Sequence, residues 1–200
     1  MKKFIEKALH DSGRFKSLYV KIFHPSAIRW ASYLRKHGSF EKIGEGTAIN
    51  RGAVVTDPYL VSIGNNCTLS DCYLVGHDGS IGVVQNFAGY QVDAVGPITI
   101  KDNCFIGINS VILRNVTIGE NSIVAAGSVV VNDVPKDSVV AGVPARVVST
   151  IDSYAAKLKA ETALLPWNNI IEQRLGTFDP SVEQELRAKR KKHYWGHQNG

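Results

Sequence analysis

The stretch "IKDNCF IGINSV ILRNVT IGENSI VAAGSV VVNDVP", residues 100–135, carries an aliphatic residue at every sixth position. A period of six matches neither the 3.6-residue period of an amphipathic helix nor the two-residue period of an ordinary strand. Stacked turns that each contribute a short strand would bury one aliphatic per hexad in a continuous core. The repeat therefore predicts an all-β solenoid, a parallel β-helix. Its aliphatic positions are Ile100, Ile106, Ile112, Ile118, Val124 and Val130, and the small or β-branched fifth positions are Cys104, Ser110, Val116, Ser122, Ser128 and Val134.

The six-residue frame also runs through the sequence before this stretch, with two interruptions. It slips by two residues near "DPYL" and is lost between Ile81 and Ile100, which predicts an inserted loop at about residues 82–97. A long loop in an otherwise regular solenoid is usually functional. The earlier aliphatic positions that we expect to be buried are Ile43, Ile49, Val55, Ile63, Leu69, Val75 and Ile81.

Helical segments are predicted on both sides of the repeats. Residues 2–23 carry an apolar stripe interrupted at "DSG", and "HPSAIRWASYLRKHG" offers Ser26 as an N-cap and Gly38 as a stop. We expect residues 1–42 to form a cap on the open end of the solenoid, in preference to resting on anionic lipid through their basic side chains. The β-helix is expected over residues 43–148. Residues 149–200 are expected to form a helical extension, with helices in "DSYAAKLKAETALL" and from about Asp179, and a basic tail.

Composition and charge argue against several classes of protein. The net charge of +5 equals the charge of a cluster near the C-terminus, so the rest of the chain is formally neutral. No nucleic-acid motif accompanies that cluster, and we expect no nucleic-acid partner. The chain has no apolar run long enough to span a membrane, and its N-terminus does not resemble a secretory signal. The three cysteines form no zinc pattern, which favours a cytoplasmic protein with reduced, buried thiols. The basic cluster is Arg187, Lys189, Arg190, Lys191 and Lys192.

His77, in "LVGHDGS" (residues 74–80), is the lone histidine of the repeat region. If Val75 points inward, His77 falls on a turn and faces outward, just before the inserted loop. Most outward histidines are inert surface residues, but a neutral imidazole can also take the proton of an attacking hydroxyl or amine. Such general base catalysis typically contributes about 10²–10⁴-fold. Asp78 and Asp93 are candidates to orient the ring.

The repeat region, about residues 43–148, resembles the hexapeptide-repeat acyltransferases, most specifically in its ending "AAGSVVVNDVPKDSVVAGVPARVV" (residues 125–148). The resemblance implies a left-handed parallel β-helix, a homotrimer with active sites between subunits, and direct acyl transfer from acyl-CoA. The sequence is similar to the galactoside, maltose and xenobiotic acetyltransferase branch, in which a catalytic histidine precedes a loop and "PITI". Here His77 precedes the loop and "GPITI" follows it at residues 96–100. The "HDG" motif is shared with members associated with polysaccharide modification.

The same resemblance implies roles for individual residues. His77 corresponds to the general base, while Asn50 and Asp57 correspond to acceptor-binding residues, although an Asp-Pro turn explains Asp57 equally well. A lysine often found at the position of Asn132 is absent. Family members that bind zinc use three histidines, and this region offers one, so we expect no metal. The further acceptor-site candidates are Asp78 and Asp93, and the acetyl-CoA groove corresponds to Gly107, Ile108, Ala126, Val131 and Asn132, with Arg146 on the nucleotide phosphate.

The predicted function is therefore acetyl-CoA-dependent O-acetylation of a hydroxyl on a sugar or glycan precursor. One alternative is N-acetylation of an amino group on a nucleotide-linked sugar, which would use the same base. Another is a β-helix that serves as a scaffold without catalysis. A scaffold would bind no acyl-CoA, and it would leave both the outward His77 and the "GVPARVV" ending unexplained.

Overall fold

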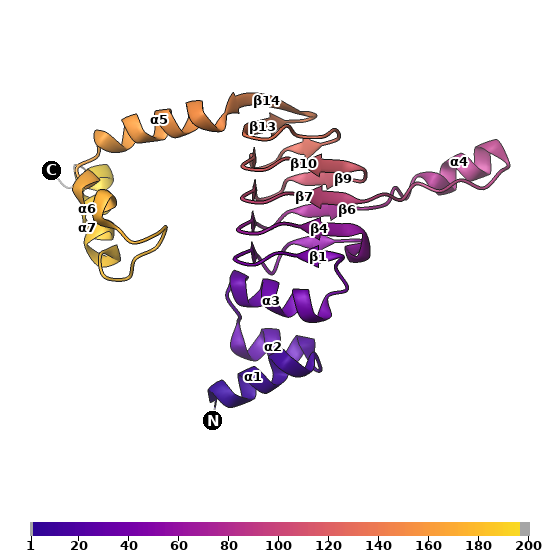
Figure 1. Ribbon diagram of the computed structural model, residues 1–200, viewed down its shortest axis with the longest axis horizontal. Coiled ribbons are helices and arrows are strands. Elements are labelled where there is room, and N and C mark those ends of the chain that lie inside the picture. Colours follow the sequence, from indigo (N-terminus) through magenta and orange to yellow (C-terminus); the bar gives the residue numbers. More distant parts are fainter. Residues whose placement is uncertain (1, 197–200) are drawn as a thin grey trace. The chain divides into compact units, whose positions relative to one another are not determined.

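The computed structural model of the chain describes residues 2–196 and divides into two compact units on either side of Ile151. The first unit contains three helices, a stack of short strands, and a fourth helix carried on an arm (Figure 1). Its helices are α1 (Lys2–Ser12), α2 (Lys16–Phe23), α3 (Ala27–His37) and α4 (Ile81–Ala88), with a 3-10 turn at Pro58–Leu60.

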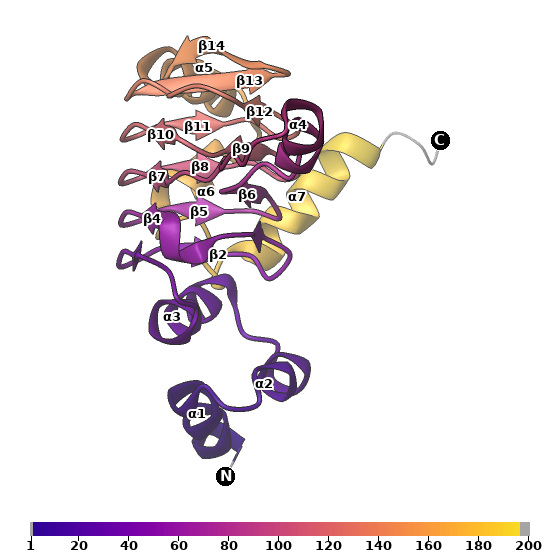
Figure 2. The ribbon, with the colours of Figure 1, turned by 90° about the vertical axis from the view of Figure 1, so that its right-hand side faces the viewer.

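Three sheets make up the stack, and from β1 to β12 successive strands along the chain belong to successive sheets. Every three strands therefore complete one coil, and all the neighbouring strands pair in parallel except β13 and β14. Figure 2 shows the coils stacked above α3. The structure confirms a parallel β-helix, and its left-handed sense stays a prediction. The first sheet contains β1 (Lys42–Ile43), β4 (Val61–Ile63), β7 (Ile98–Ile100) and β10 (Val116–Ile118). The second contains β2 (Ala48–Ile49), β5 (Thr68–Leu69), β8 (Phe105–Ile106), β11 (Ile123–Val124), β13 (Ser138–Gly142) and β14 (Ala145–Thr150). The third contains β3 (Val54–Val55), β6 (Tyr73–Val75), β9 (Val111–Leu113) and β12 (Val129–Val130).

The hexad positions predicted over residues 100–135 are all buried, as are the three cysteines, which are free thiols. The expectation for Val75 is wrong, because Leu74 is the buried residue of β6 and Val75 is only half-buried. Val55 is also half-buried, and Ile81 lies half-buried at the start of α4, outside the coils. Leu74 follows Leu69 after five residues instead of six, since Cys72 N–H donates to the Ser70 carbonyl at 2.7 Å and tightens the turn. His77 nevertheless faces outward, as predicted.

The repeating core predicts a large cost for truncating one inward aliphatic. Ile106 is fully buried at the middle of the stack, so Ile106→Ala should lower the free energy of unfolding by about 2–5 kcal/mol. Val54, which faces outward from β3, is 46% exposed, and Val54→Ala should change it by no more than about 0.5 kcal/mol. Urea unfolding at one protein concentration measures both. Equal losses in the two variants would contradict the assigned register.

The helices at the start of the chain pack on the first coil. Ser26 caps α3 by accepting from Arg29 N–H, and Gly38 ends it, as the sequence predicts. Trp30 and Tyr33 of α3 join the buried cluster that includes Ile43 and Ile49. α3 therefore covers the apolar end that the first coil would otherwise expose.

The second unit contains helices around its own small core. α5 (Ile151–Ala163) agrees with the predicted helix, while α7 (Glu183–Trp195) begins later than the expected start at Asp179. The Asp179 carboxylate accepts from Ser181 N–H and forms a turn there. α6 (Asn168–Gln173) was not predicted, and it contributes Ile170 to a core with Trp167 and Leu186. The β-helix ends with β14 at Thr150, two residues beyond the predicted boundary at 148.

Candidate functional site

His77 lies directly against Asp57, with 2.6 Å between its Nδ1 atom and Asp57 Oδ2. The Asp57 side chain is 15% exposed, whereas the His77 side chain is 48% exposed. An ionised carboxylate only accepts hydrogen bonds, so Nδ1 carries the proton and donates to Asp57. In the neutral imidazole this contact selects the tautomer whose Nε2 atom keeps its lone pair, which is the form that a general base needs.

Stacking of the coils brings these two residues together although they are twenty positions apart. Val55 of β3 pairs with Leu74 of β6, and each strand then runs into a turn at the same corner of the β-helix. Gly76 leaves room for the contact, because a Cβ atom there would lie 2.9 Å from the Asp57 carboxylate. Thr56 Oγ1 donates to Asp57 Oδ2 at 2.7 Å and accepts from Gly76 N–H at 3.0 Å. The acid is thus fixed by neighbours on both coils.

These hydrogen bonds also keep Asp57 ionised. Donation from Thr56, followed by donation from His77, lowers the pKa of Asp57 below its ordinary value. Both donors favour the charged form of the carboxylate. The acid is therefore ready to hold the imidazole in one tautomer at neutral pH.

Because the pKa of Asp57 is lower in the folded chain, its carboxylate stabilises the fold above the unfolded value of 3.8. This contribution is lost as the pH falls through the lower folded pKa. We expect wild type to be more stable than Asp57→Asn at neutral pH, and the difference to shrink below pH 3.8. Urea unfolding of both proteins, from neutral pH to below pH 3.8, measures this difference in stability. A difference that stays constant at the lowest pH would contradict the pairing.

A two-stranded segment fixes the backbone of His77. Residues 76–78 run antiparallel to residues 94–96, with a bridge between His77 and Val95. Asp78 N–H donates to the Ala94 carbonyl, and Gly96 N–H donates to the Gly76 carbonyl, both at 2.9 Å. The predicted inserted loop therefore leaves the coil earlier than residue 82.

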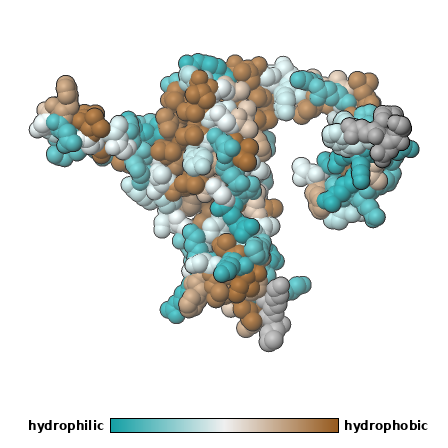
Figure 3. Space-filling model, turned by 180° about the vertical axis from the view of Figure 1, so that it is seen from behind, coloured by the Kyte–Doolittle hydropathy of each residue, from teal (hydrophilic) through white to brown (hydrophobic). Residues whose placement is uncertain are grey.

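Between these strands the chain forms an arm, residues 78–94, that projects from the β-helix and carries α4 (Figure 1). The sequence predicted a loop here, and the helix is a correction. Figure 3 shows apolar atoms at the end of this arm. Phe87 is 93% exposed, and Val83 and Tyr90 are also largely exposed. The arm thus presents apolar side chains that the described residues of the first unit leave exposed.

A hollow of about 570 Å³ opens beside His77. Its walls include Val75 of β6, Leu113 of β9 and Val131 just after β12, which are stacked at successive coils of the third sheet. Arg114 also lines it, a residue that the sequence analysis missed. Its position in the hexad could have identified it from the sequence, because Arg114 follows β9 at the same corner where His77 follows β6. It brings a positive charge beside the imidazole.

The residues that correspond to a cofactor groove lie at two different corners of the β-helix. Gly107, Ile108 and Ala126 lie in turns between the second and third sheets. Val131 and Asn132 follow β12, at the corner that His77 occupies. Asn132 lines a second hollow together with Arg146. A Cβ atom at Gly107 would lie 2.5 Å from Ala126 N, so stacking of the coils by itself requires this glycine.

The acceptor candidates are also separated. Asn50 lines a different hollow, with Arg51 and Asp71, and the structure does not bring it to His77. The Asp78 carboxylate accepts from Ser80 N–H at 2.9 Å, and Asp93 accepts from Ala94 N–H at 2.8 Å. Neither acid orients the imidazole as the sequence suggested, since Asp57 has that place. Asp78 still lines the hollow beside His77.

Residues 2–196 show neither a metal-binding cluster nor a membrane-spanning helix. No three His, Cys, Asp or Glu side chains in that range are grouped so that they could hold a metal ion. Within the same range, no helix combines the length and the apolar character that a membrane span requires.

Comparison with known proteins gives matches within the repeat region. Residues 97–132 match the family described as bacterial transferase hexapeptide (six repeats). The chain is 37% identical over 119 residues to galactoside O-acetyltransferase of Escherichia coli, covering 58% of this chain and 57% of that enzyme. It is 51% identical over 69 residues to 2,3,4,5-tetrahydropyridine-2,6-dicarboxylate N-acetyltransferase of Clostridium perfringens, covering 34% of this chain and 28% of that enzyme. These matches therefore extend over only part of each relative.

The fold has a solved counterpart. A hexapeptide-repeat-containing acetyltransferase from Vibrio cholerae superposes with a TM-score of 0.52 at 24% sequence identity. The match covers 73% of this chain and 92% of that protein. This likeness concerns the arrangement of the backbone, and it supports the parallel β-helix described above.

Proposed function

We propose that this chain, whose residues 97–132 match the hexapeptide-repeat transferase family, is an acetyl-CoA-dependent O-acetyltransferase that acts on a sugar or glycan precursor. The observation that carries the proposal is the contact between Asp57 and His77 at an exposed corner of the β-helix. It leaves the Nε2 atom of His77 free to accept a proton from an attacking hydroxyl.

The proposed reaction is a direct transfer. His77 removes the hydroxyl proton of the acceptor while that oxygen attacks the thioester carbonyl of acetyl-CoA. The new C–O bond forms, the C–S bond breaks, and the thiolate of CoA leaves and takes up a proton. Asp57 stabilises the imidazolium that forms during this step and keeps its ring in place. The only atoms transferred are those of the acetyl group and the proton.

The two-corner arrangement of the cofactor candidates supports a site between chains. One copy offers His77, Val131 and Asn132 at one corner, and a second copy offers Gly107, Ile108 and Ala126 at another. A homotrimer with threefold symmetry would place unlike corners against each other three times. The exposed apolar side chains of the arm support the same assembly, because a neighbouring copy would cover them. Arg146 would meet a phosphate of CoA at the edge of that groove.

The acceptor is proposed as a hydroxyl on a sugar or glycan, by the similarity to galactoside O-acetyltransferase. The N-acetyltransferase among the relatives supports the alternative acceptor, an amine. Asp78 and Arg114 line the hollow beside His77 and offer hydrogen bonds of opposite polarity to an acceptor. We place the reaction in the cytoplasm, where acetyl-CoA is available.

Release of CoA in the presence of a panel of acceptors tests the function. The panel pairs sugars that carry only hydroxyls with their amino counterparts, and mass spectrometry locates the acetyl group on each product. The proposal expects acceptor-dependent release of CoA and an O-acetyl ester on at least one hydroxyl sugar. Acetylation of amines alone would favour the N-acetyltransferase. Absence of saturable CoA binding would favour the scaffold.

A further inference from the structure

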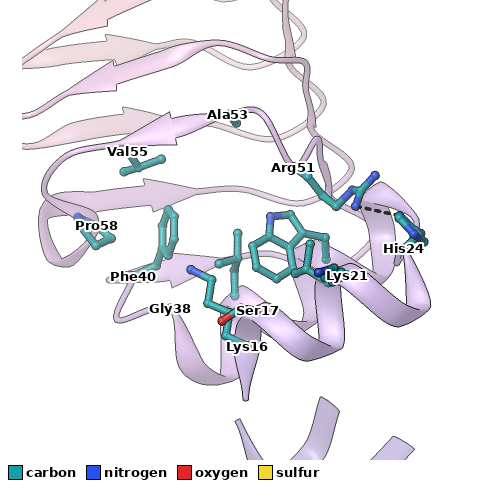
Figure 4. Close-up of a pocket in the computed structure, with 13 residues that line it drawn as sticks. Lys16, Ser17, Lys21, His24, Gly38, Phe40, Arg51, Ala53, Val55 and Pro58 are labelled. Atoms are coloured by element: carbon teal, nitrogen blue, oxygen red, sulfur yellow. Dashed lines mark hydrogen bonds between the residues drawn. The ribbon is translucent and has the colours of Figure 1, made fainter. Parts of the chain in front are cut away.

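Another hollow, of about 640 Å³, lies at the N-terminal end of the β-helix, between the N-terminal helices and the first coil. Figure 4 shows side chains from α2, from the end of α3 and from the first coil directed around one space. Its volume falls in the range of small-molecule sites, about 300–1,000 Å³. None of its residues lines the hollow beside His77.

Apolar side chains form most of its inner wall. Trp30 and Leu34 of α3 line it, and Phe40, Val55 and Pro58 line it from the first coil. Trp30 is 6% exposed and stacks on Tyr33 with 5.2 Å between ring centroids, so its ring is held in place. This rigid apolar wall suits an alkyl chain and offers little to a bare sugar or a free anion.

Two of the three Lys and Arg side chains that line the hollow lie at one end of it. Lys21 and Arg51 lie together at the end opposite Phe40 and Pro58 in Figure 4, with His24 beside Arg51 at 3.4 Å. The third, Lys16, extends toward Phe40 in Figure 4, with its Nζ atom 5.3 Å from the centre of the Trp30 ring. The residues that line the hollow include no Asp or Glu. Among the described residues, Lys16, Lys21 and Arg51 form no ion pair with a carboxylate.

We propose that this hollow binds a single-chain lipid phosphate, with the phosphate between Lys21 and Arg51 and the alkyl chain along Trp30 toward Phe40. Charge complementarity selects the anionic head, because the basic groups have no acidic neighbour in the site. The apolar wall selects the chain, because burying methylenes favours binding in proportion to their area. Arg51 suits phosphate through its planar fork, and Lys21 adds a mobile cation.

Isothermal titration calorimetry with decyl phosphate, kept below its micelle concentration, tests this site. We expect saturable binding with one molecule per chain, and affinity that falls about fourfold for each methylene removed in shorter alkyl phosphates. Inorganic phosphate and the cation decyltrimethylammonium should bind at least about tenfold more weakly. Equal affinity for the cationic amphiphile would overturn the proposal, as would an affinity independent of chain length.

Variants separate this hollow from other basic surfaces. Lys21→Gln with Arg51→Gln should weaken decyl phosphate at least about tenfold, and the matched pair Arg190→Gln with Lys191→Gln on α7 should not. Ser17→Trp, at an exposed position on the rim, should block the chain without disturbing the core. Circular dichroism confirms that each variant is folded. The proposal would be overturned if all three variants bound decyl phosphate with the affinity of wild type.

Vesicles distinguish this site from a membrane-binding surface. Phosphatidylcholine vesicles that contain phosphatidylglycerol offer the same phosphate chemistry in a bilayer. Binding to them without saturable binding of monomeric decyl phosphate would overturn the site and assign the basic helices to a lipid surface. Competition of decyl phosphate with vesicle binding, lost in the Lys21→Gln and Arg51→Gln variant, would support it.

Discussion

His77→Ala is expected to lower kcat for acetyl transfer by about 10²–10⁴-fold, because the variant removes the base that takes the acceptor proton. The imidazole is half exposed, and its only side-chain partner among the described residues is Asp57. The loss should therefore fall on the chemical step, and the fold should be unaffected. Steady-state release of CoA at saturating acetyl-CoA and acceptor measures it.

The KM for acetyl-CoA separates this loss from a binding defect. We expect KM to change little in His77→Ala, since the imidazole acts on the acceptor hydroxyl and is not one of the candidate cofactor residues. The unfolding midpoint at neutral pH should fall slightly, because Asp57 loses one of the donors that lower its pKa, and circular dichroism should show the wild-type fold. A variant that keeps wild-type kcat would remove His77 from the mechanism.

Asp57→Asn is expected to lower kcat by on the order of 10²-fold or more, although it changes few atoms. The carboxylate fixes the proton on Nδ1 of His77, whereas an amide can donate to Nδ1 and place the proton on Nε2. A protonated Nε2 atom cannot accept the proton of a hydroxyl. The same kinetic assay measures the loss, and the KM for acetyl-CoA again should change little.

Asp78→Asn provides the matched control for this substitution. Asp78 adjoins His77 in sequence, but its carboxylate accepts from Ser80 N–H and does not contact the ring. Because Asp78 lines the hollow proposed for the acceptor, Asp78→Asn should act mainly on the KM for the acceptor, and its effect on kcat at saturating acceptor should be much smaller than that of Asp57→Asn. Equal losses of kcat in the two variants would mean that a negative charge near the site is what matters, and that orientation of the His77 ring by Asp57 is not.

The six-residue period was enough to predict the core of the β-helix, because each hexad must bury side chains at the same two positions. Ile106, Ile112 and Ser110 are completely buried as the period requires. The period failed at Leu74 and Val75, where both candidates are aliphatic and hydropathy alone cannot choose between them. The choice depends on the tight turn after Leu69, which is a backbone hydrogen bond.

The outward direction of His77 could be predicted, but its partner could not. The sequence suggested Asp78 and Asp93, which are close along the chain or in the loop, and assigned Asp57 to the acceptor. Contact with Asp57 depends on which strands stack, since strands in adjacent coils lie about 4.8 Å apart. The pairing of Val55 with Leu74 brings Asp57 beside the turn that carries His77. This pairing can be derived from the sequence only if the five-residue spacing between Leu69 and Leu74 is already known.

Helix α4 was missed for a different reason. Its eight residues, "IGVVQNFA", have no side-chain N-cap bond, and most of their large apolar side chains are exposed. Short helices gain most of their stability from packing, so a helix without a visible partner gives a weak sequence signal. A neighbouring copy that covers Val83 and Phe87 would supply the missing partner.

A crystal structure of the protein with CoA tests the central claim most directly. It should show CoA between two copies, in contact with Gly107 and Ile108 of one and with Val131 of the other. The sulfur should lie close enough to His77 for a hydroxyl placed between them to reach Nε2 at about 2.6–3.2 Å. CoA bound within a single copy, or with its sulfur remote from His77, would contradict the account.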